Sequence, residues 1–183
     1  MIYKKLGEKM KVVMIFDQIQ SGAGTKDDKN VPLAGKKEAL GPAVMMQPML
    51  KEIDARVMAC LYCGTGTYEN NKEEVSRKLC AMIQKLNPDV VMCGPAFNYL
   101  DYGAMAAKIA YDISIKTNIP VLAAMSEENE DTIQTYKDKV SIVKTPKKGG
   151  FGLNDALRNM CILAKAKVNH EDTTALEKEI CFK

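Results

Sequence analysis

Five short apolar runs recur along the chain, and the intervals between them leave room for helices. Each run is almost continuously hydrophobic, which is typical of strands covered on both faces and not of strands with one face in water. The runs are KVVMIF (11–16), RVMACLYC (56–63), DVVMCG (89–94), IPVLAAM (119–125) and VSIVK (140–144). The pattern therefore predicts five buried β-strands.

Helical patterns separate these runs. Residues 41–54 and 72–86 place apolar side chains three and four positions apart, as one face of an amphipathic helix requires. Residues 103–117 begin with small residues, and residues 153–168 carry one apolar stripe. The connection 126–139 is polar, and its helical pattern is shorter.

The alternation of strand and helix predicts a doubly wound α/β fold. Parallel strands need crossover connections, and right-handed crossovers place helices on both faces of a sheet. We expect a five-stranded parallel sheet in a flavodoxin-like three-layer sandwich, with strand order 2-1-3-4-5 favoured over 3-2-1-4-5. Residues 1–168 would form this single α/β domain, and residues 169–183 would form a charged C-terminal tail.

Composition narrows the class of protein. The 26 basic and 23 acidic residues nearly cancel and are spread along the chain, so the charge pattern does not favour nucleic-acid binding. No apolar stretch approaches the roughly 20 residues that span a bilayer, and the first residues lack a small-residue cleavage site, so we expect a cytoplasmic protein. Four of the six cysteines lie in apolar segments, where a free thiol packs as a small apolar group.

Unusual residues gather where the predicted strands end. The carboxyl ends of parallel strands meet at one edge of a sheet, and ligands bind there in doubly wound folds. A loop of about 25 residues follows the first strand, whereas such connections usually have about 2 to 6 residues. The other connections at this edge are rich in glycine, aromatic and amide residues, while those at the opposite edge are short polar turns. We therefore expect a ligand crevice at the carboxyl edge.

The stretch GPAFNYLDYG (94–103) supplies most of this chemistry. Gly94 would let the backbone approach a ligand closely, and Pro95 would fix a turn. Phe97 and Tyr102 would either face the crevice or pack over the end of the sheet. Asn98 would either bind the ligand or satisfy loop backbone groups as an Asx turn.

Other reactive patterns point to chemistry less clearly. Cys60 and Cys63 form a C-x-x-C pair at a strand end, whereas a redox pair needs its cysteine at a helix N-terminus. Cys63 remains a candidate catalytic residue, although a packing or hydrogen-bonding role is favoured, and no catalytic residue is assigned. Because His170 is the single histidine, the sequence predicts neither a metal site nor a Ser-His-Asp triad. Acidic residues at the edge are Asp17, Glu69, Asp101, Glu127 and Glu128, and the sequence singles out no pair of them.

A weaker anion-binding pattern precedes the last long helix. Its residues are Lys147, Lys148, Gly149 and Gly150. Amides and the helix dipole favour an anion at such a place. Solvated lysines in a flexible loop are the favoured alternative.

Four of these connections carry motifs of a known family. They are SGAGT (21–25), CGTGTYENN (63–71), CGPAFNYLDYG (93–103) and SEEN (126–129). The chain resembles, from about residue 11 to 168, the amino-terminal half of the selenoprotein B family of glycine, sarcosine and betaine reductases. It departs from the family pattern at Thr65, where the family has Asp, and at Glu127, where the family has Pro.

The resemblance implies a subunit of a glycine, sarcosine, betaine or D-proline reductase-like selenoprotein complex of anaerobic bacteria, an oxidoreductase. The subunit would bind an amino acid or betaine, or partner subunits, for reductive deamination with electrons from thioredoxin. No cofactor is expected in this chain; a pyruvoyl group and selenocysteine are expected on partner subunits, and the selenocysteine-bearing half is not expected here. The sequence also leaves open whether the chain forms a homo-oligomer. The expected substrate-binding residues are Gly24, Cys63, Gly64, Tyr68, Asn70, Gly94, Pro95, Phe97, Asn98 and Tyr102.

Two other functions stay open from the residues alone. One is a stand-alone, flavodoxin-like domain that binds a small ligand or phosphate through residues 147–150. The other is a purely structural partner domain, which would need an exposed apolar patch.

Overall fold

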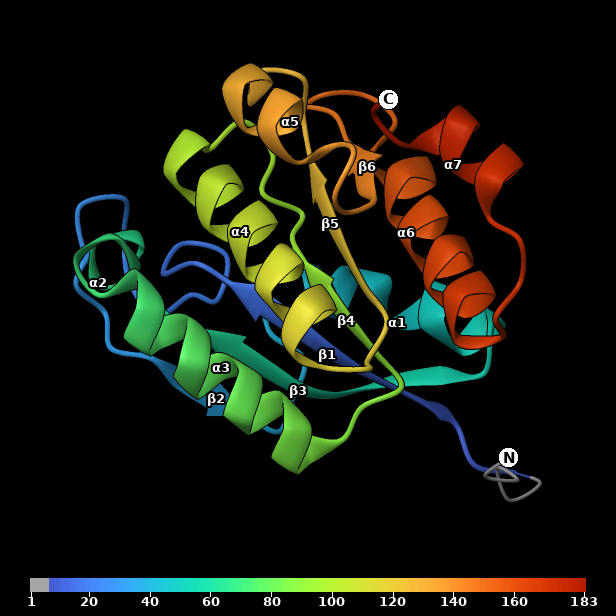
Figure 1. Cartoon of the computed structure of the whole chain (residues 1–183), viewed down its shortest axis with the longest axis horizontal. Coiled ribbons are helices and arrows are strands. Elements are labelled where there is room, and N and C mark those ends of the chain that lie inside the picture. Colours follow the sequence, from blue (N-terminus) through green and yellow to red (C-terminus); the bar gives the residue numbers. More distant parts are fainter. Residues whose placement is uncertain (1–6) are drawn as a thin grey trace.

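A six-stranded sheet lies between two layers of helices in the computed structural model, which describes residues 7–183 (Figure 1). The strands are β1 (Met10–Phe16), β2 (Ala34–Lys36), β3 (Ala55–Tyr62), β4 (Val90–Cys93), β5 (Val121–Met125) and β6 (Ile142–Lys144). Their order in the sheet is β2-β3-β1-β4-β5-β6. All neighbouring pairs are parallel except β2 with β3, which is antiparallel.

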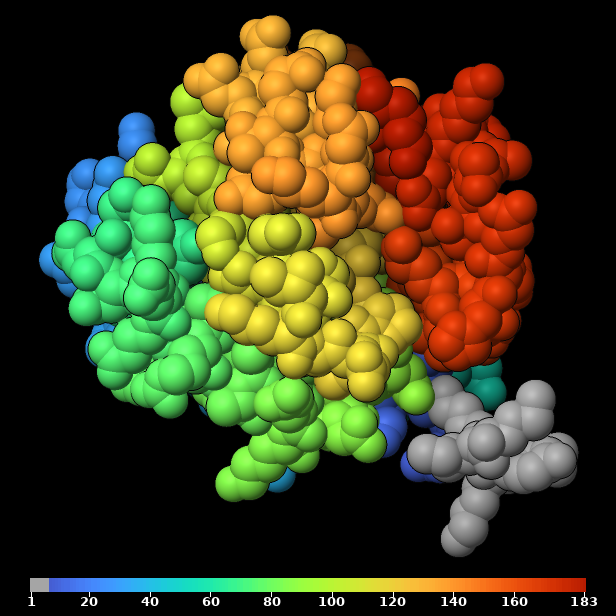
Figure 2. Space-filling model, viewed as in Figure 1, coloured from blue at the N-terminus to red at the C-terminus, as the bar shows by residue number. Residues whose placement is uncertain are grey.

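Helices cover both faces of the sheet. Helices α3, α4 and α5 lie side by side on one face, and Figure 2 shows them as one continuous surface; α1 and α6 pack together on the other face. The helices are α1 (Pro42–Glu52), α2 (Thr65–Asn70), α3 (Lys72–Leu86), α4 (Leu100–Lys116), α5 (Glu130–Tyr136), α6 (Leu153–Val168) and α7 (Thr174–Ile180). Among residues 7–183, no helix combines the length and the apolar character that a bilayer crossing requires.

Each of the five apolar runs forms a parallel strand. These strands lie in the order β3-β1-β4-β5-β6, which is the 2-1-3-4-5 order that the sequence favoured. The expected number of strands was wrong, because β2 adds a sixth. This strand has the sequence AGK, joins the sheet through backbone pairing with β3, and is too short and polar to give a hydrophobic signal.

The burial of the central strands explains their continuous hydrophobic runs. Residues 12–16 of β1 and all four residues of β4 are buried, because helices cover both faces of these strands. The long helix α3 buries one stripe, which includes Val75, Leu79 and Ile83, and ends where Asn87 takes a left-handed conformation (φ 49°).

Residues 169–183, expected as a charged tail, pack against the edge of the sheet. They contain α7, and beyond it Cys181 forms an antiparallel bridge with Val143 of β6. The Phe182 amide donates a hydrogen bond to the Ile142 carbonyl at 3.0 Å. Ile180 and Cys181 are buried. Two adjacent apolar residues give no periodic pattern, so the sequence did not show how this segment packs.

Candidate functional site

The loop after β1 runs over the carboxyl edge of the sheet and is folded by its own polar groups. Asp17 directly follows β1, and its carboxylate accepts a hydrogen bond from the Gln20 amide at 2.7 Å. The Gly24 amide donates to the Gln18 carbonyl at 3.0 Å. The Gln18 side chain in turn accepts a hydrogen bond from the Thr65 amide at 3.1 Å. These bonds fix the start of the loop beside the end of β3.

The far part of the same loop lies against the segment after β3. The Gly64 amide donates to the Val31 carbonyl at 2.8 Å, and the Gly66 and Thr67 amides donate to the Lys29 carbonyl at 2.8 and 3.0 Å. The Thr67 hydroxyl adds a bond of 2.9 Å to Val31. A Cβ atom on Gly64 would lie 2.0 Å from the Lys29 carbonyl oxygen. Glycine at position 64 therefore permits the contact that holds Lys29 at this edge.

The loop after β4 is tied to the loop after β5. Gly94 has a φ of 131°, and a Cβ atom there would lie 2.6 Å from the Ala124 carbonyl oxygen. The peptide bond between Gly94 and Pro95 is cis. The Phe97 carbonyl accepts bonds from the Ser126 amide at 3.0 Å and the Asn129 side chain at 2.7 Å. The turn residues expected to approach a ligand thus bring two parts of the protein together.

A crevice of about 400 Å³ opens where the loops after β1, β3 and β4 meet. It lies beside β1 and β4, between which the strand order reverses, and this is where doubly wound folds bind ligands. Its volume is in the range of small-molecule sites. Its lining residues are Asp17, Gln18, Ile19, Lys26, Lys29, Thr65, Asn98, Tyr99, Leu100, Asp101 and Tyr102.

Asp17 is the buried acidic group of the crevice. Its side chain is almost fully buried, and burial raises its pKa to about 6, although hydrogen bonds from backbone amides oppose the rise. Lys29 is paired with Asp101 at 3.1 Å, and both side chains are largely exposed. The crevice therefore combines one desolvated carboxyl group with exposed lysines. The sequence named Asp17 among the acids of this edge but gave no sign of its burial.

Of the expected substrate-binding residues, Asn98 and Tyr102 line the crevice. The Asn98 side chain accepts a bond from the Lys148 amide at 2.9 Å. Tyr102 is fully buried, and its hydroxyl donates to the Ile15 carbonyl of β1 at 2.6 Å. Phe97 is buried beneath the Lys148 ammonium group, which lies 4.7 Å from the centre of its ring.

The other expected residues lie around the crevice or away from it. Gly24, Gly64, Gly94 and Pro95 shape the loops, as described above. Tyr68 on α2 is buried, and its hydroxyl has no hydrogen-bond partner within residues 7–183. Asn70 is exposed at the end of α2.

Cys63 is buried at the end of β3. Its sulfur lies 3.8 Å from that of Met105. Burial, with a smaller contribution from the nearby Asp17 charge, raises the pKa of the Cys63 thiol to about 12. The thiol is therefore protonated at neutral pH, when a nucleophile would need to be a thiolate. All six cysteines lie in the described part of the chain and are free.

The amides of the loop at residues 147–150 are partly engaged within the protein. The Lys148 amide donates to Asn98, and the Gly150 amide donates to the Lys147 carbonyl at 2.9 Å. Fewer amide donors are therefore free for an anion than the sequence indicated.

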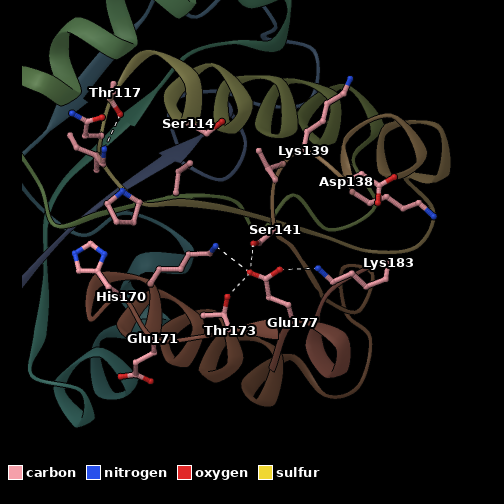
Figure 3. Close-up of a pocket in the computed structure, with 17 residues that line it drawn as sticks. Ser114, Thr117, Asp138, Lys139, Ser141, His170, Glu171, Thr173, Glu177 and Lys183 are labelled. Carbon is pink, nitrogen blue, oxygen red and sulfur yellow. Dashed lines mark hydrogen bonds and ion pairs between the residues drawn. The ribbon is translucent and has the colours of Figure 1, made fainter. Parts of the chain in front are cut away.

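A larger hollow of about 910 Å³ lies at the opposite edge of the sheet (Figure 3). Figure 3 shows Glu177 of α7 at the centre of its polar contacts, where it accepts bonds from Ser141 at 2.8 Å, Thr173 at 3.0 Å, Lys167 at 3.2 Å and Lys183 at 2.8 Å. These bonds attach α7 to α6 and to Ser141, the residue directly before β6. Within residues 7–183, no cluster of His, Cys, Asp or Glu side chains is placed to hold a metal ion.

A mostly parallel sheet with helices on both faces, and a crevice at its strand-order reversal, defines the general class of α/β domains. Comparison with known families makes this more specific. The model of the glycine/sarcosine/betaine reductase selenoprotein B family matches residues 9–183, and the chain belongs to this family. The resemblance seen in the loop motifs is confirmed.

Curated relatives support the same assignment. The chain is 29% identical over 158 residues to the sarcosine reductase complex component B subunit beta of Peptoclostridium acidaminophilum, covering 86% of this chain and 35% of the relative. It is 28% identical over 171 residues to the glycine reductase complex component B subunit gamma of Carboxydothermus hydrogenoformans, covering 93% and 39%. The chain thus spans well under half the length of these relatives. No solved structure matches it.

Proposed function

We propose that this chain is a subunit of a glycine, sarcosine, betaine or D-proline reductase-like complex and that it binds the substrate for reductive deamination. The observation that carries this proposal is the family match over residues 9–183. The crevice at the strand-order reversal supports it, because it is of suitable size and lies at the edge where the family motifs meet.

The chemistry of the crevice suits a small zwitterion. A carboxylate at Asp17 would attract the positively charged nitrogen of an amino acid or betaine, and a desolvated charge interacts more strongly than an exposed one. Lys26 or Lys29 would attract the carboxylate of the same ligand. The amide of Asn98 would add a hydrogen bond at the rim of the crevice.

Reduction would depend on groups outside this chain. The Cys63 thiol is protonated and buried, so it is poorly suited to covalent chemistry. In our proposal a pyruvoyl group and selenocysteine on partner subunits, with electrons from thioredoxin, supply the reactive chemistry. The flavodoxin-like sheet of this chain would position the substrate within a cytoplasmic complex.

Titration calorimetry with glycine, sarcosine and betaine tests the binding proposal. We expect one of these ligands to bind saturably and Asp17→Asn to weaken its binding by about tenfold, the loss expected for one charge-assisted interaction. Affinity should rise with pH through about 6, because the Asp17 carboxyl ionises there. Asp138→Asn, at an exposed site on the opposite edge, is the matched control and should bind as the unmodified chain does.

Two results would contradict this assignment of the crevice. One is the absence of saturable binding of all three ligands, and the other is undiminished binding by Asp17→Asn. The proposal that this chain is a subunit of the complex is tested separately. Substrate-dependent reductase activity of the partner subunits is measured with and without the purified chain.

A further inference from the structure

A second hollow opens at the same edge of the sheet, between the loops that follow β5 and β6. It has a volume of about 440 Å³, and Phe182, near the C-terminus, is one of the residues that line it. None of its lining residues lines the crevice described above. It is therefore a separate site, and its interpretation does not rest on the proposed function.

Two hydroxyl-bearing residues begin the loops that form this hollow. Ser126 and Thr145 directly follow β5 and β6, and they are 1% and 8% exposed. The Thr145 amide donates to the Met125 carbonyl at 3.0 Å, which locks the two strand ends together. The Thr145 hydroxyl has no hydrogen-bond partner among residues 7–183. A buried hydroxyl without a partner costs about 1 to 3 kcal/mol, and a polar group bound in the hollow would supply one.

The charged side chains of the hollow are segregated by sign. Glu127 and Glu128 come from the loop after β5, whereas Lys144 and Lys147 come from β6 and the loop after it. The Ser126 hydroxyl and a backbone amide lower the pKa of Glu128, and the charge of Lys147 adds to this effect. Neither lysine forms an ion pair within the described part of the chain. Equal numbers of separated opposite charges favour a ligand that is itself dipolar.

An exposed aromatic ring stands at the mouth of the hollow. Phe151 is fully exposed, and it shares the lining with Pro146 and Phe182. Covering an exposed phenyl group is worth about 2 kcal/mol. The neighbouring Gly149 and Gly152 have φ values of 77° and 85°, which only glycine adopts readily. These glycines present the ring to solvent at a polar hollow.

We propose that this hollow binds a small zwitterion that carries an apolar group, of the class of α-amino acids with a large apolar side chain. The ligand carboxylate would accept hydrogen bonds from the Lys147 ammonium group and the Thr145 hydroxyl. The ligand ammonium group would donate to Glu128. Its apolar group would cover Phe151.

Titration of the full chain with four probes tests each part of this proposal. The probes are L-phenylalanine, phenylacetate, which lacks the ammonium group, phenethylamine, which lacks the carboxylate, and glycine, which lacks the apolar group. We expect L-phenylalanine to bind this hollow with a dissociation constant of about 1 mM and each of the other three to bind it at least about tenfold more weakly. Glycine is titrated into Asp17→Asn, so that binding at the crevice is not counted. Calorimetry and nuclear magnetic resonance shifts are the measurements.

Variants locate the binding. Lys147→Met, Glu128→Gln and Phe151→Ala should each weaken L-phenylalanine binding by about tenfold, and all three residues are exposed, so the variants should fold normally. The matched controls at exposed positions outside both the hollow and the crevice are Lys85→Met, Glu73→Gln and Ile115→Ala.

The proposal is overturned by any of three results. They are the absence of saturable L-phenylalanine binding up to about 10 mM, equal affinity for phenylacetate and L-phenylalanine, and undiminished binding by the three variants. Failure of these tests would not contradict the role proposed for the Asp17 crevice, because the two sites share no residue.

Discussion

Replacing Gly64 with alanine tests whether the loop after β1 is held at the candidate site by close backbone contact. The added Cβ atom would lie 2.0 Å from the Lys29 carbonyl oxygen, whereas real Cβ atoms stay at least 3.0 Å from such an atom. The loop must therefore move by about 1 Å or more. Gly64 has a φ of −65°, so alanine causes no backbone strain, and the effect comes from the contact alone.

The magnitude follows from the hydrogen bonds that the contact permits. Four bonds join the segment 64–67 to the carbonyl groups of Lys29 and Val31. A net value of about 1 kcal/mol for each gives a loss of about 4 kcal/mol if all four break. In the variant, water would form hydrogen bonds with some of the groups that lose their partners. We therefore expect Gly64→Ala to lower the free energy of unfolding by about 2 to 4 kcal/mol.

Urea unfolding measures the free-energy change, and hydrogen exchange locates it. The Gly66 and Thr67 amides should lose protection, since they donate to the displaced Lys29 carbonyl. Gly22→Ala is the control in the same loop: its Cβ atom would meet no atom within 4 Å, but its φ of 75° carries a strain of about 1 kcal/mol. If Gly64→Ala is no more destabilising than Gly22→Ala and keeps these amides protected, the reasoning is wrong.

Three further predictions concern the buried groups. Tyr102→Phe should lower the free energy of unfolding by about 1 to 2 kcal/mol, because it leaves the Ile15 carbonyl without this donor; a larger loss of ligand affinity than of stability would refute this structural role. Cys63 should resist iodoacetamide in the folded chain at neutral pH, since burial raises its pKa to about 12, and mass spectrometry would show early labelling if its thiol were a nucleophile. Burial alone would raise the pKa of Glu177, but bonds from Lys183 and Ser141 and the charge of Lys167 lower it from 4.5 to about 2. The unfolded state then binds more protons between these values, so this stability is complete above pH 4.5 and is lost as pH falls toward 2. After allowance for solvent it amounts to about 1 to 2 kcal/mol, and acid unfolding of Glu177→Gln, which should lack this dependence, measures it.

Hydrophobic pattern was sufficient to predict the parallel strands, because helices cover both faces of these strands and leave long uninterrupted apolar runs. It could not show β2, whose three residues join the sheet through backbone groups that carry no sequence signal. It also placed the start of the helix after β4 at residue 103, whereas α4 begins at Leu100. The reason is that Tyr102 looked like a loop residue, but it points into the core from the first turn of the helix.

The sequence predicted the position of the crevice better than it predicted the residues that line it. The sequence indicated the carboxyl edge, where the crevice lies, because glycine and aromatic residues gather there. It left open whether Phe97 and Tyr102 face a ligand or pack over the sheet, and both are buried. The burial of Asp17 depends on loops distant in sequence, so no local pattern shows it.

The bridge between Cys181 and Val143 has a consequence for association between chains. An unpaired edge strand invites another chain to extend the sheet, and this is a common route to fibrils. The C-terminal residues already occupy the β6 edge through this bridge and the bond from Phe182 to Ile142. At the other edge β2 offers three residues, one of them lysine. The two edge strands, β2 and β6, are therefore poor templates for pairing with a strand from another chain.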